Sequence, residues 1–149
     1  MLSQESQNIL QQIRHQLEER HLVGKRFTWL PCHAIDLHKD GELNAHVDSV
    51  RFSGDIVAGL SLVSSSIMRL IPDDGEDAPS NSDVTDTNRG WVDLYLPPRS
   101  LYVMAGPGRY LYSHQLLKSG SVFENANHES SPITVTRDHR LSVIFRDSK

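Results

Sequence analysis

The sequence predicts a mainly β protein, a jelly roll of two facing sheets with one amphipathic helix packed outside it at the N-terminus. Apolar residues within 4–22 recur at helical spacing and form one stripe, which consists of Ile9, Leu10, Ile13 and Leu17. From Phe27 onward the pattern changes to short runs rich in Val, Ile, Leu and Tyr, broken by Gly, Pro and Asp turns. No repeat period is visible, and the regular spacing of these runs favours two packed sheets.

The chain of 149 residues is long enough for one domain with its own core. We expect this single domain to span 1–149, with the helix and its connection in 1–26 and the jelly roll in 27–146. Residues 72–89 are rich in Asp, Ser, Asn, Pro and Thr, which predicts a mobile acidic surface loop. Residues 120–131 form a second polar connection. Aromatic residues favour half-buried pleats, so a strand core is expected to contain Trp91, Tyr95 and Leu96.

Composition narrows the class of function. The formal net charge is −4 and no dense basic patch is visible, which argues against DNA as a partner. No apolar run is long enough to span a bilayer, so we expect no membrane association. The single cysteine, Cys32, excludes an intramolecular disulfide and suits a reducing compartment. The N-terminal segment is unlike a transit peptide, which is poor in acidic residues, because it contains Glu5, Glu18 and Glu19. Separately, we expect the protein to be a monomer.

The first candidate for chemistry is the triplet His46-Val47-Asp48, inside a strand-like stretch from Glu42 to Phe52. Side chains two apart in a strand share a face, so His46 and Asp48 can both reach one metal ion. A solvated strand face explains this pair, taken alone, equally well. A second such triplet, His38-Lys39-Asp40, runs into Gly41, and Asp-Gly between two strand-like runs predicts a hairpin turn.

A third ligand is offered by His114, which ends the aromatic-rich, strand-like run 109–114 after a Gly106-Pro107-Gly108 turn. With His46 and Asp48 it would complete one face of an octahedron and leave the opposite positions open. Two histidines and one carboxylate in this arrangement suit Fe(II) that must bind a co-substrate and O2 together.

The run 140–146 predicts a strand with an arginine at each end. Arg140 and Arg146 are six residues apart and therefore lie on the same face of that strand. Charged strand ends also serve solubility, but Arg places two donors on one carboxylate, so the pair is a candidate clamp for a dicarboxylate. His33 is expected to be structural, and His139 is a candidate for supporting the site through its neighbour Arg140.

The order of these anchors resembles that of the AlkB family of Fe(II)- and 2-oxoglutarate-dependent dioxygenases. The stretches 46–52, 56–62 and 67–70, and then Ser100-Leu101-Tyr102-Val103, resemble the mitochondrial branch, which is linked to programmed necrosis and lipid metabolism rather than to DNA repair. The resemblance covers residues 33–146 and implies a double-stranded β-helix.

The resemblance also implies a role for each anchor. His46, Asp48 and His114 would hold Fe(2+). Arg140 would pair with the distal carboxylate of 2-oxoglutarate, and Tyr102 would hydrogen-bond the same co-substrate. Arg146 would lie near the other end of 2-oxoglutarate or near the substrate. The implied activity is oxidation of a C–H bond by O2 with release of succinate and CO2. The implied compartment is the mitochondrial matrix, with the cytoplasm as the alternative.

Three departures from the nucleic-acid-repairing members argue against DNA as the substrate. Ile35-Asp36-Leu37 stands where those enzymes carry an Asn-x-Tyr element, and Ser142 and Ile144 stand where they carry Asn and Thr. Only about forty residues precede His46, too few for a full lid that grips a flipped base. We therefore expect a protein or other non-DNA substrate. An RNA N-demethylase and a weakly active jelly-roll module that binds a partner are the alternatives.

Overall fold

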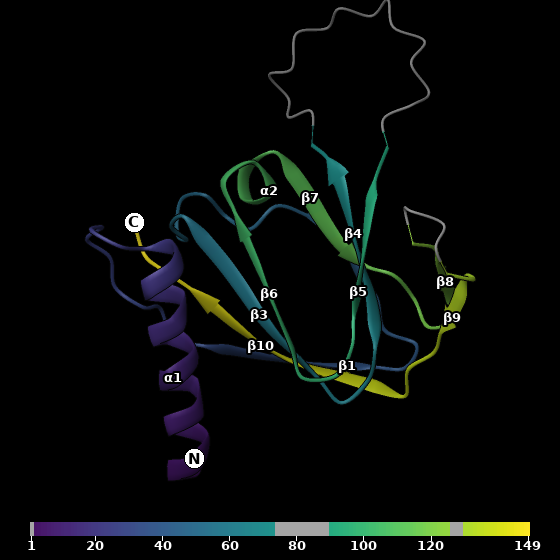
Figure 1. The fold of residues 1–149 in the computed structure, drawn as a ribbon, viewed down its shortest axis with the longest axis horizontal. Coiled ribbons are helices and arrows are strands. Elements are labelled where there is room, and N and C mark those ends of the chain that lie inside the picture. The colour runs from purple at the N-terminus through teal and green to yellow at the C-terminus, as the bar shows by residue number, and fades with distance from the viewer. Residues whose placement is uncertain (1, 74–89, 126–129) are drawn as a thin grey trace, which may run out of the picture.

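The computed structural model describes residues 2–73, 90–125 and 130–149 and contains two four-stranded sheets (Figure 1). We call the first the helix-covered sheet; its order is β1-β10-β3-β6, with bounds His33–His38, His139–Arg146, Ile56–Leu62 and Ser100–Ala105. We call the second the facing sheet; its order is β2-β7-β4-β5, with bounds Leu43–His46, Tyr112–Leu116, Ser66–Pro72 and Val92–Leu96. All neighbouring strands are antiparallel.

Apart from the β4–β5 hairpin, the chain alternates between the two sheets from one of these strands to the next, which is the connectivity of a jelly roll. The predicted fold class is therefore confirmed. Most of the predicted loop at 72–89, namely residues 74–89, lies outside the described residues.

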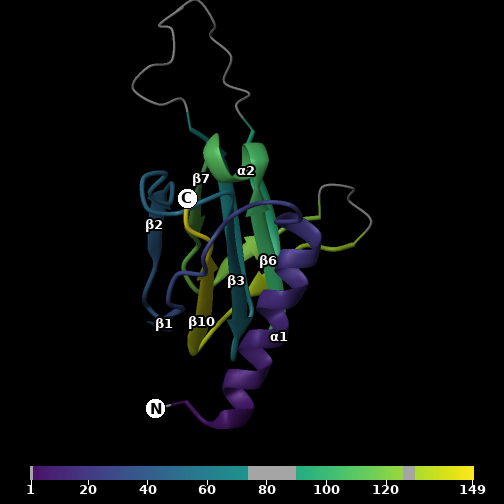
Figure 2. The same cartoon turned by 90° about the vertical axis from the view of Figure 1, so that its left-hand side faces the viewer.

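Helix α1, Gln4–His21, covers the outer face of the helix-covered sheet. It begins after Ser3, whose hydroxyl accepts a hydrogen bond from the Ser6 N–H. Leu17 of the helix and Leu22 beyond it are buried in one cluster with side chains of β3 and β10, which are Ile56, Ala58 and Phe145. Figure 2 shows the helix lying along this sheet, as the sequence predicted. The predicted stripe was wrong at Ile9, which is 47% exposed.

Among the described residues, no helix combines the length and apolar character needed to cross a membrane.

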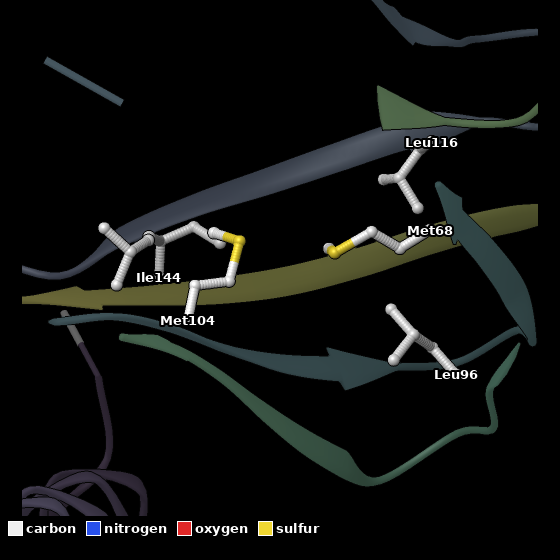
Figure 3. Close-up of a cluster of buried hydrophobic side chains, with 6 residues drawn as sticks. Met68, Leu96, Met104, Leu116 and Ile144 are labelled. Atoms are coloured by element: carbon white, nitrogen blue, oxygen red, sulfur yellow. The ribbon is translucent and has the colours of Figure 1, made fainter. Parts of the chain in front are cut away.

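The space between the sheets holds a second apolar cluster (Figure 3). Met104 and Ile144 come from the helix-covered sheet, whereas Met68, Leu96 and Leu116 come from the facing sheet. The side chains of Met104 and Met68 point toward one another across the gap. Alternating burial along β10 follows from the strand period, and it directs Ser142 and Ile144 inward beside Arg140.

The residue after β10 fixes the start of β3. Asp147 is buried, and its carboxylate accepts hydrogen bonds from the backbone N–H groups of Asp55 and Ile56, both at 3.0 Å. Glycine is required at position 54, because a Cβ there would stand 2.4 Å from Asp147 Oδ2. The contact anchors the end of the segment that joins β2 to β3.

Replacing Asp147 with Ala should lower the free energy of unfolding by roughly 2–4 kcal/mol, because two buried N–H groups would lose a charged acceptor. Urea unfolding followed by circular dichroism measures this. Asp147→Asn retains one acceptor oxygen and should lose less. Equal stability of the Ala and Asn variants would contradict this account.

The segment before β7 differs from its prediction. Residues Gly106–Tyr110 form a short helix, α2, where a turn and the start of a strand were predicted, and β7 begins at Tyr112. Pro107 explains the helix, because its missing N–H and fixed φ suit the first helical turn. The predicted polar connection at 120–131 contains β8, Ser121–Phe123, which pairs with β9, Ile133–Val135.

The aromatic residues near β5 also differ from their prediction. Leu96 is buried as predicted, but Trp91 is 57% exposed and Tyr95 is 38% exposed. β5 is an edge strand of the facing sheet, with Trp91 just before it, and the Tyr95 ring lies 5.6 Å from that of Phe123 in β8. The guanidinium of Arg69 lies 4.4 Å from the Trp91 ring centroid, and the Tyr95 hydroxyl hydrogen-bonds with Ser65.

Candidate metal centre

The pairing of β2 with β7 places two histidines side by side. His46, the last residue of β2, is the antiparallel partner of His114, and their ring centroids are 4.3 Å apart. Asp48 follows in the loop, so the predicted strand through Phe52 was wrong beyond His46. The reason is a turn in which the Ser49 carbonyl accepts from the N–H groups of Phe52 and Ser53. The loop still brings Asp48 back to the histidines.

The three predicted ligands form a cluster in which one ligand atom from each residue lies within 4.8 Å of the others. Asp48 Oδ2 is 3.7 Å from His114 Nε2. His46 Nδ1 lies 2.8 Å from the Asn44 carbonyl oxygen, which can only accept, so Nδ1 carries the hydrogen and Nε2 is left for a metal. Two imidazoles and one carboxylate on one side of an ion fit Fe(II) with open positions.

The pKa of His114 is lowered to about 4, mainly by burial; His46 and Arg109 act in the same direction, and Asp48 opposes them. A lowered pKa means that the His114 imidazole takes up a proton less readily in the folded protein than in water. His114 is therefore neutral near pH 7, which is the form that binds a metal ion.

His38 ends β1, and Lys39 and Asp40 form a turn as predicted, but the predicted hairpin was wrong, because β1 and β2 lie in different sheets. The Gly41 N–H donates to the His38 carbonyl at 2.9 Å, and the His38 and Asp40 side chains are 75% and 80% exposed. Among the described residues, His38 and Asp40 belong to no cluster of three or more side chains that could hold a metal ion.

The cluster opens into a cavity of about 120 Å³ between the two sheets. His46, Asp48 and His114 line it together with Tyr102, Arg140 and Arg146. All six predicted site residues are thus brought to one place. The apolar part of the wall consists of Ile35, Leu43, Val57, Met68, Leu116 and Ile144.

Arg140 is a cation held between the sheets, 1% exposed. Its Nε donates to Ser61 Oγ at 3.0 Å, and its Nη2 is buried without a hydrogen-bond partner in the described part of the chain. Burial lowers the pKa of Arg140, whereas the charge and hydrogen bond of Tyr102 raise it. A buried guanidinium with an unused donor is costly unless an anion meets it, so this end of the cavity suits a carboxylate.

Tyr102 lies beside Arg140 because β3 has a glycine opposite it. Gly59 is the cross-strand partner of Tyr102, and a Cβ at Gly59 would stand 2.3 Å from the Tyr102 hydroxyl oxygen. Burial raises the pKa of Tyr102, against a smaller opposing effect of Arg140, so the hydroxyl keeps its proton and can donate.

Gly59→Ala should displace the Tyr102 ring from the cavity, because the methyl group and the ring cannot occupy the same space. We expect 2-oxoglutarate affinity to fall at least tenfold while Fe(II) affinity changes little. Calorimetric titration under anaerobic conditions measures both. Tyr102→Phe is the control for loss of the hydroxyl alone. Unchanged 2-oxoglutarate binding in Gly59→Ala would remove Tyr102 from the co-substrate site.

Arg146 lies toward the metal end of the cavity. Its Nη1 is 4.0 Å from Asp48 Oδ1, and its Nη2 donates to His33 Nδ1 at 3.1 Å. The structural role expected of His33 is thus to hold Arg146. His139 is exposed and pairs across the sheet with His38, outside the lining of the cavity.

Sequence reasoning assigned no role to Arg109, the first residue of the strand-like run 109–114. The side chain is 2% exposed and donates to the Asp48 carbonyl. No local pattern indicated this, because the acceptor is 61 residues away in the chain.

Comparison with known proteins places the chain among named relatives. No family model matches it. The chain is 37% identical over 116 residues to the mitochondrial alpha-ketoglutarate-dependent dioxygenase alkB homolog 7 of Mus musculus, covering 78% of this chain and 44% of the relative. The counterpart in Bos taurus is 36% identical over 114 residues, 76% of this chain and 43% of the relative. An uncharacterised protein of Acanthamoeba polyphaga mimivirus is 27% identical over 114 residues, 76% of this chain and 46% of that protein.

The chain therefore spans less than half the length of the curated relatives it matches. Its jelly roll agrees with the fold expected from the sequence resemblance. Over about three quarters of its own length, the chain is therefore similar to two proteins that are named as mitochondrial alpha-ketoglutarate-dependent dioxygenases of the alkB type.

Proposed function

We propose that the chain is an Fe(II)- and 2-oxoglutarate-dependent dioxygenase that oxidises a C–H bond with O2 and releases succinate and CO2. One observation carries the proposal. A cluster of two histidines and one carboxylate shares a cavity of about 120 Å³ with a buried guanidinium that has an unused donor. The names of the two AlkB relatives support the same activity.

Each residue of the cavity has a role in this proposal that follows from its position. Nε2 of His46, Nε2 of His114 and a carboxylate oxygen of Asp48 would hold the ion from one side. With 2-oxoglutarate, bound Fe(II) supplies the O2-dependent oxidation, for which the protein provides orientation. Arg140 would fix the far carboxylate of 2-oxoglutarate through Nη2, and Tyr102 would donate to the same co-substrate. Arg146, near Asp48, would steady the metal end.

The apolar wall keeps the reacting atoms away from water. Val57, Met68, Leu116 and Ile144 line the cavity and belong to the buried apolar cluster between the sheets. Exclusion of water strengthens the interaction of Arg140 with a carboxylate, because charges attract more strongly at low dielectric.

For the substrate we propose a protein side chain or another group that is not DNA, in mitochondria and in a process related to necrosis or fatty-acid metabolism. The net charge of −4 gives little counterion-release affinity for nucleic acid. Ile35, an apolar residue, lines the cavity where the repair enzymes place a polar element.

Anaerobic addition of 2-oxoglutarate to the Fe(II) protein tests the activity. We expect a metal-to-ligand absorption band in the visible range and slow succinate release once air is admitted. Metal binding without the band and without succinate would leave a binding module instead. Methylated RNA and DNA oligonucleotides in the same tube distinguish the substrates, and formaldehyde formed in step with succinate would favour a nucleic-acid demethylase.

A further inference from the structure

Arg109 is a buried cation whose hydrogen-bond acceptors are main-chain oxygens, and its guanidinium also lies 5.0 Å from the centroid of the Tyr110 ring. Its side chain is 2% exposed on α2, and its Nη1 and Nη2 donate to the carbonyl oxygens of Asp48 at 2.8 Å and Ser49 at 3.4 Å. Within the described residues it forms no ion pair, and its Nε has no hydrogen-bond partner. Burying a guanidinium costs free energy, and the two hydrogen bonds to the carbonyl oxygens are what the buried group of Arg109 provides in return.

The fork joins two segments that each carry a candidate metal ligand. The Asp48–Ser49 segment lies between β2 and β3, and α2 leads through Leu111 directly into β7, which carries His114. His46 is already held against His114 by strand pairing. Asp48 has no such ladder, because β2 ends at His46.

The Ser49 carbonyl is where this loop closes on itself. It accepts from the N–H groups of Phe52 at 3.3 Å and Ser53 at 3.0 Å, and Arg109 Nη2 approaches the same oxygen. The guanidinium therefore grips both the carbonyl of the ligand residue and the oxygen that closes the turn after it.

We infer that Arg109 is a positioning residue for the metal centre: its guanidinium straps the Asp48 loop to the start of β7 and sets the Asp48 carboxylate beside His114. This inference rests on the proposed function, because it concerns the same metal ligands. Residues that support metal ligands from outside typically change metal affinity by 10–100-fold when they are replaced.

The charge of Arg109 has the opposite effect, which makes the inference testable. A nearby positive charge disfavours a cation, so removing it would tighten metal binding if charge were all that mattered. Removing the strap would weaken binding. Arg109→Lys keeps the charge and loses the fork, whereas Arg109→Gln loses the charge as well.

Arg137 provides the matched control. It is also a buried arginine, 6% exposed, and it also donates to two backbone carbonyl oxygens, those of Leu117 and Gly41. Neither acceptor belongs to the metal cluster. Arg137→Lys therefore repeats the loss of a buried pair of carbonyl hydrogen bonds at an arginine that does not line the cavity.

In the experiment, the whole chain is titrated with Co(II) under anaerobic conditions, without 2-oxoglutarate, and the visible absorption bands are followed. Thermal unfolding of each metal-free variant is measured separately. We expect Co(II) affinity to fall 10–100-fold in both Arg109→Lys and Arg109→Gln and to stay within about threefold of wild type in Arg137→Lys. The Arg109 variants should also show altered band positions, because the carboxylate loses its fixed orientation. A loss of stability alone would not shift the bands.

Five results would overturn the inference. Unchanged affinity and spectrum in Arg109→Lys, or tighter binding in Arg109→Gln, would show that the strap does not set the site. Equal loss of Co(II) affinity in Arg137→Lys would reduce the effect to general destabilisation. If both Arg109 variants fail to fold while Arg137→Lys folds, Arg109 serves the fold and not the site. If wild type itself binds no Co(II), the proposed function fails first and the inference with it.

Discussion

His46→Ala, Asp48→Ala and His114→Ala are each expected to abolish tight Fe(II) binding, whereas His38→Ala and Asp40→Ala should leave it intact. The three candidate ligand atoms lie within 4.8 Å of one another, so the loss of one removes a bond and leaves a two-point site. The exposed pair in the turn has no third ligand nearby in the described structure. The measurement is the iron retained after anaerobic loading and gel filtration.

The three ligand variants should differ in stability, and this separates loss of a ligand from loss of the fold. His46 is exposed, so His46→Ala should unfold at nearly the wild-type temperature without metal. His114 is 9% exposed, and its removal leaves a cavity that should lower that temperature. A His38→Ala or Asp40→Ala variant that lost iron as severely as His46→Ala would show that the ligands are wrongly assigned.

The parts of this site that sequence predicts are those governed by strand periodicity. Arg140 and Arg146 were placed on one face because six is an even number of residues, and both line the cavity. The amphipathic stripe of α1 was predicted from the helical period, and it was wrong only at Ile9, which is exposed and is not in the apolar cluster between the helix and the sheet. Tyr102 had no signal of its own and came from the family resemblance.

The parts that sequence does not predict depend on partners far away in the chain. The strand through His46 ends where a turn closes at Ser49, and Arg109, 60 residues later, holds that turn. An aromatic-rich run around Arg109 has the composition of a strand, so local propensity could not identify the helix there. Exposure of Trp91 and Tyr95 depends on β5 being an edge, which follows from strand order and not from residue type.

Arg140→Lys is expected to leave Fe(II) binding unchanged and to raise the apparent KM for 2-oxoglutarate by roughly ten- to a hundredfold. Lysine keeps the charge but loses the planar fork, and part of about 1.5–3 kcal/mol of charged hydrogen bonding goes with it. The buried environment adds to the effect, because Arg140 is 1% exposed and water cannot replace the missing donor. Uncoupled succinate release, followed against 2-oxoglutarate concentration at saturating Fe(II), gives the KM.

Arg146→Lys is the comparison variant that distinguishes which of the two arginines binds the distal carboxylate of 2-oxoglutarate. Arg146 is held by His33 at 3.1 Å and stands 4.0 Å from Asp48, so its nearest partners belong to the protein and to the metal end of the cavity. Its replacement should raise the KM for 2-oxoglutarate less than that of Arg140 and should disturb Fe(II) affinity more. Equal KM values for wild type and Arg140→Lys would remove Arg140 from the clamp. A larger KM effect at Arg146 would move the distal carboxylate to the other end of β10, and with it the direction in which 2-oxoglutarate enters the cavity.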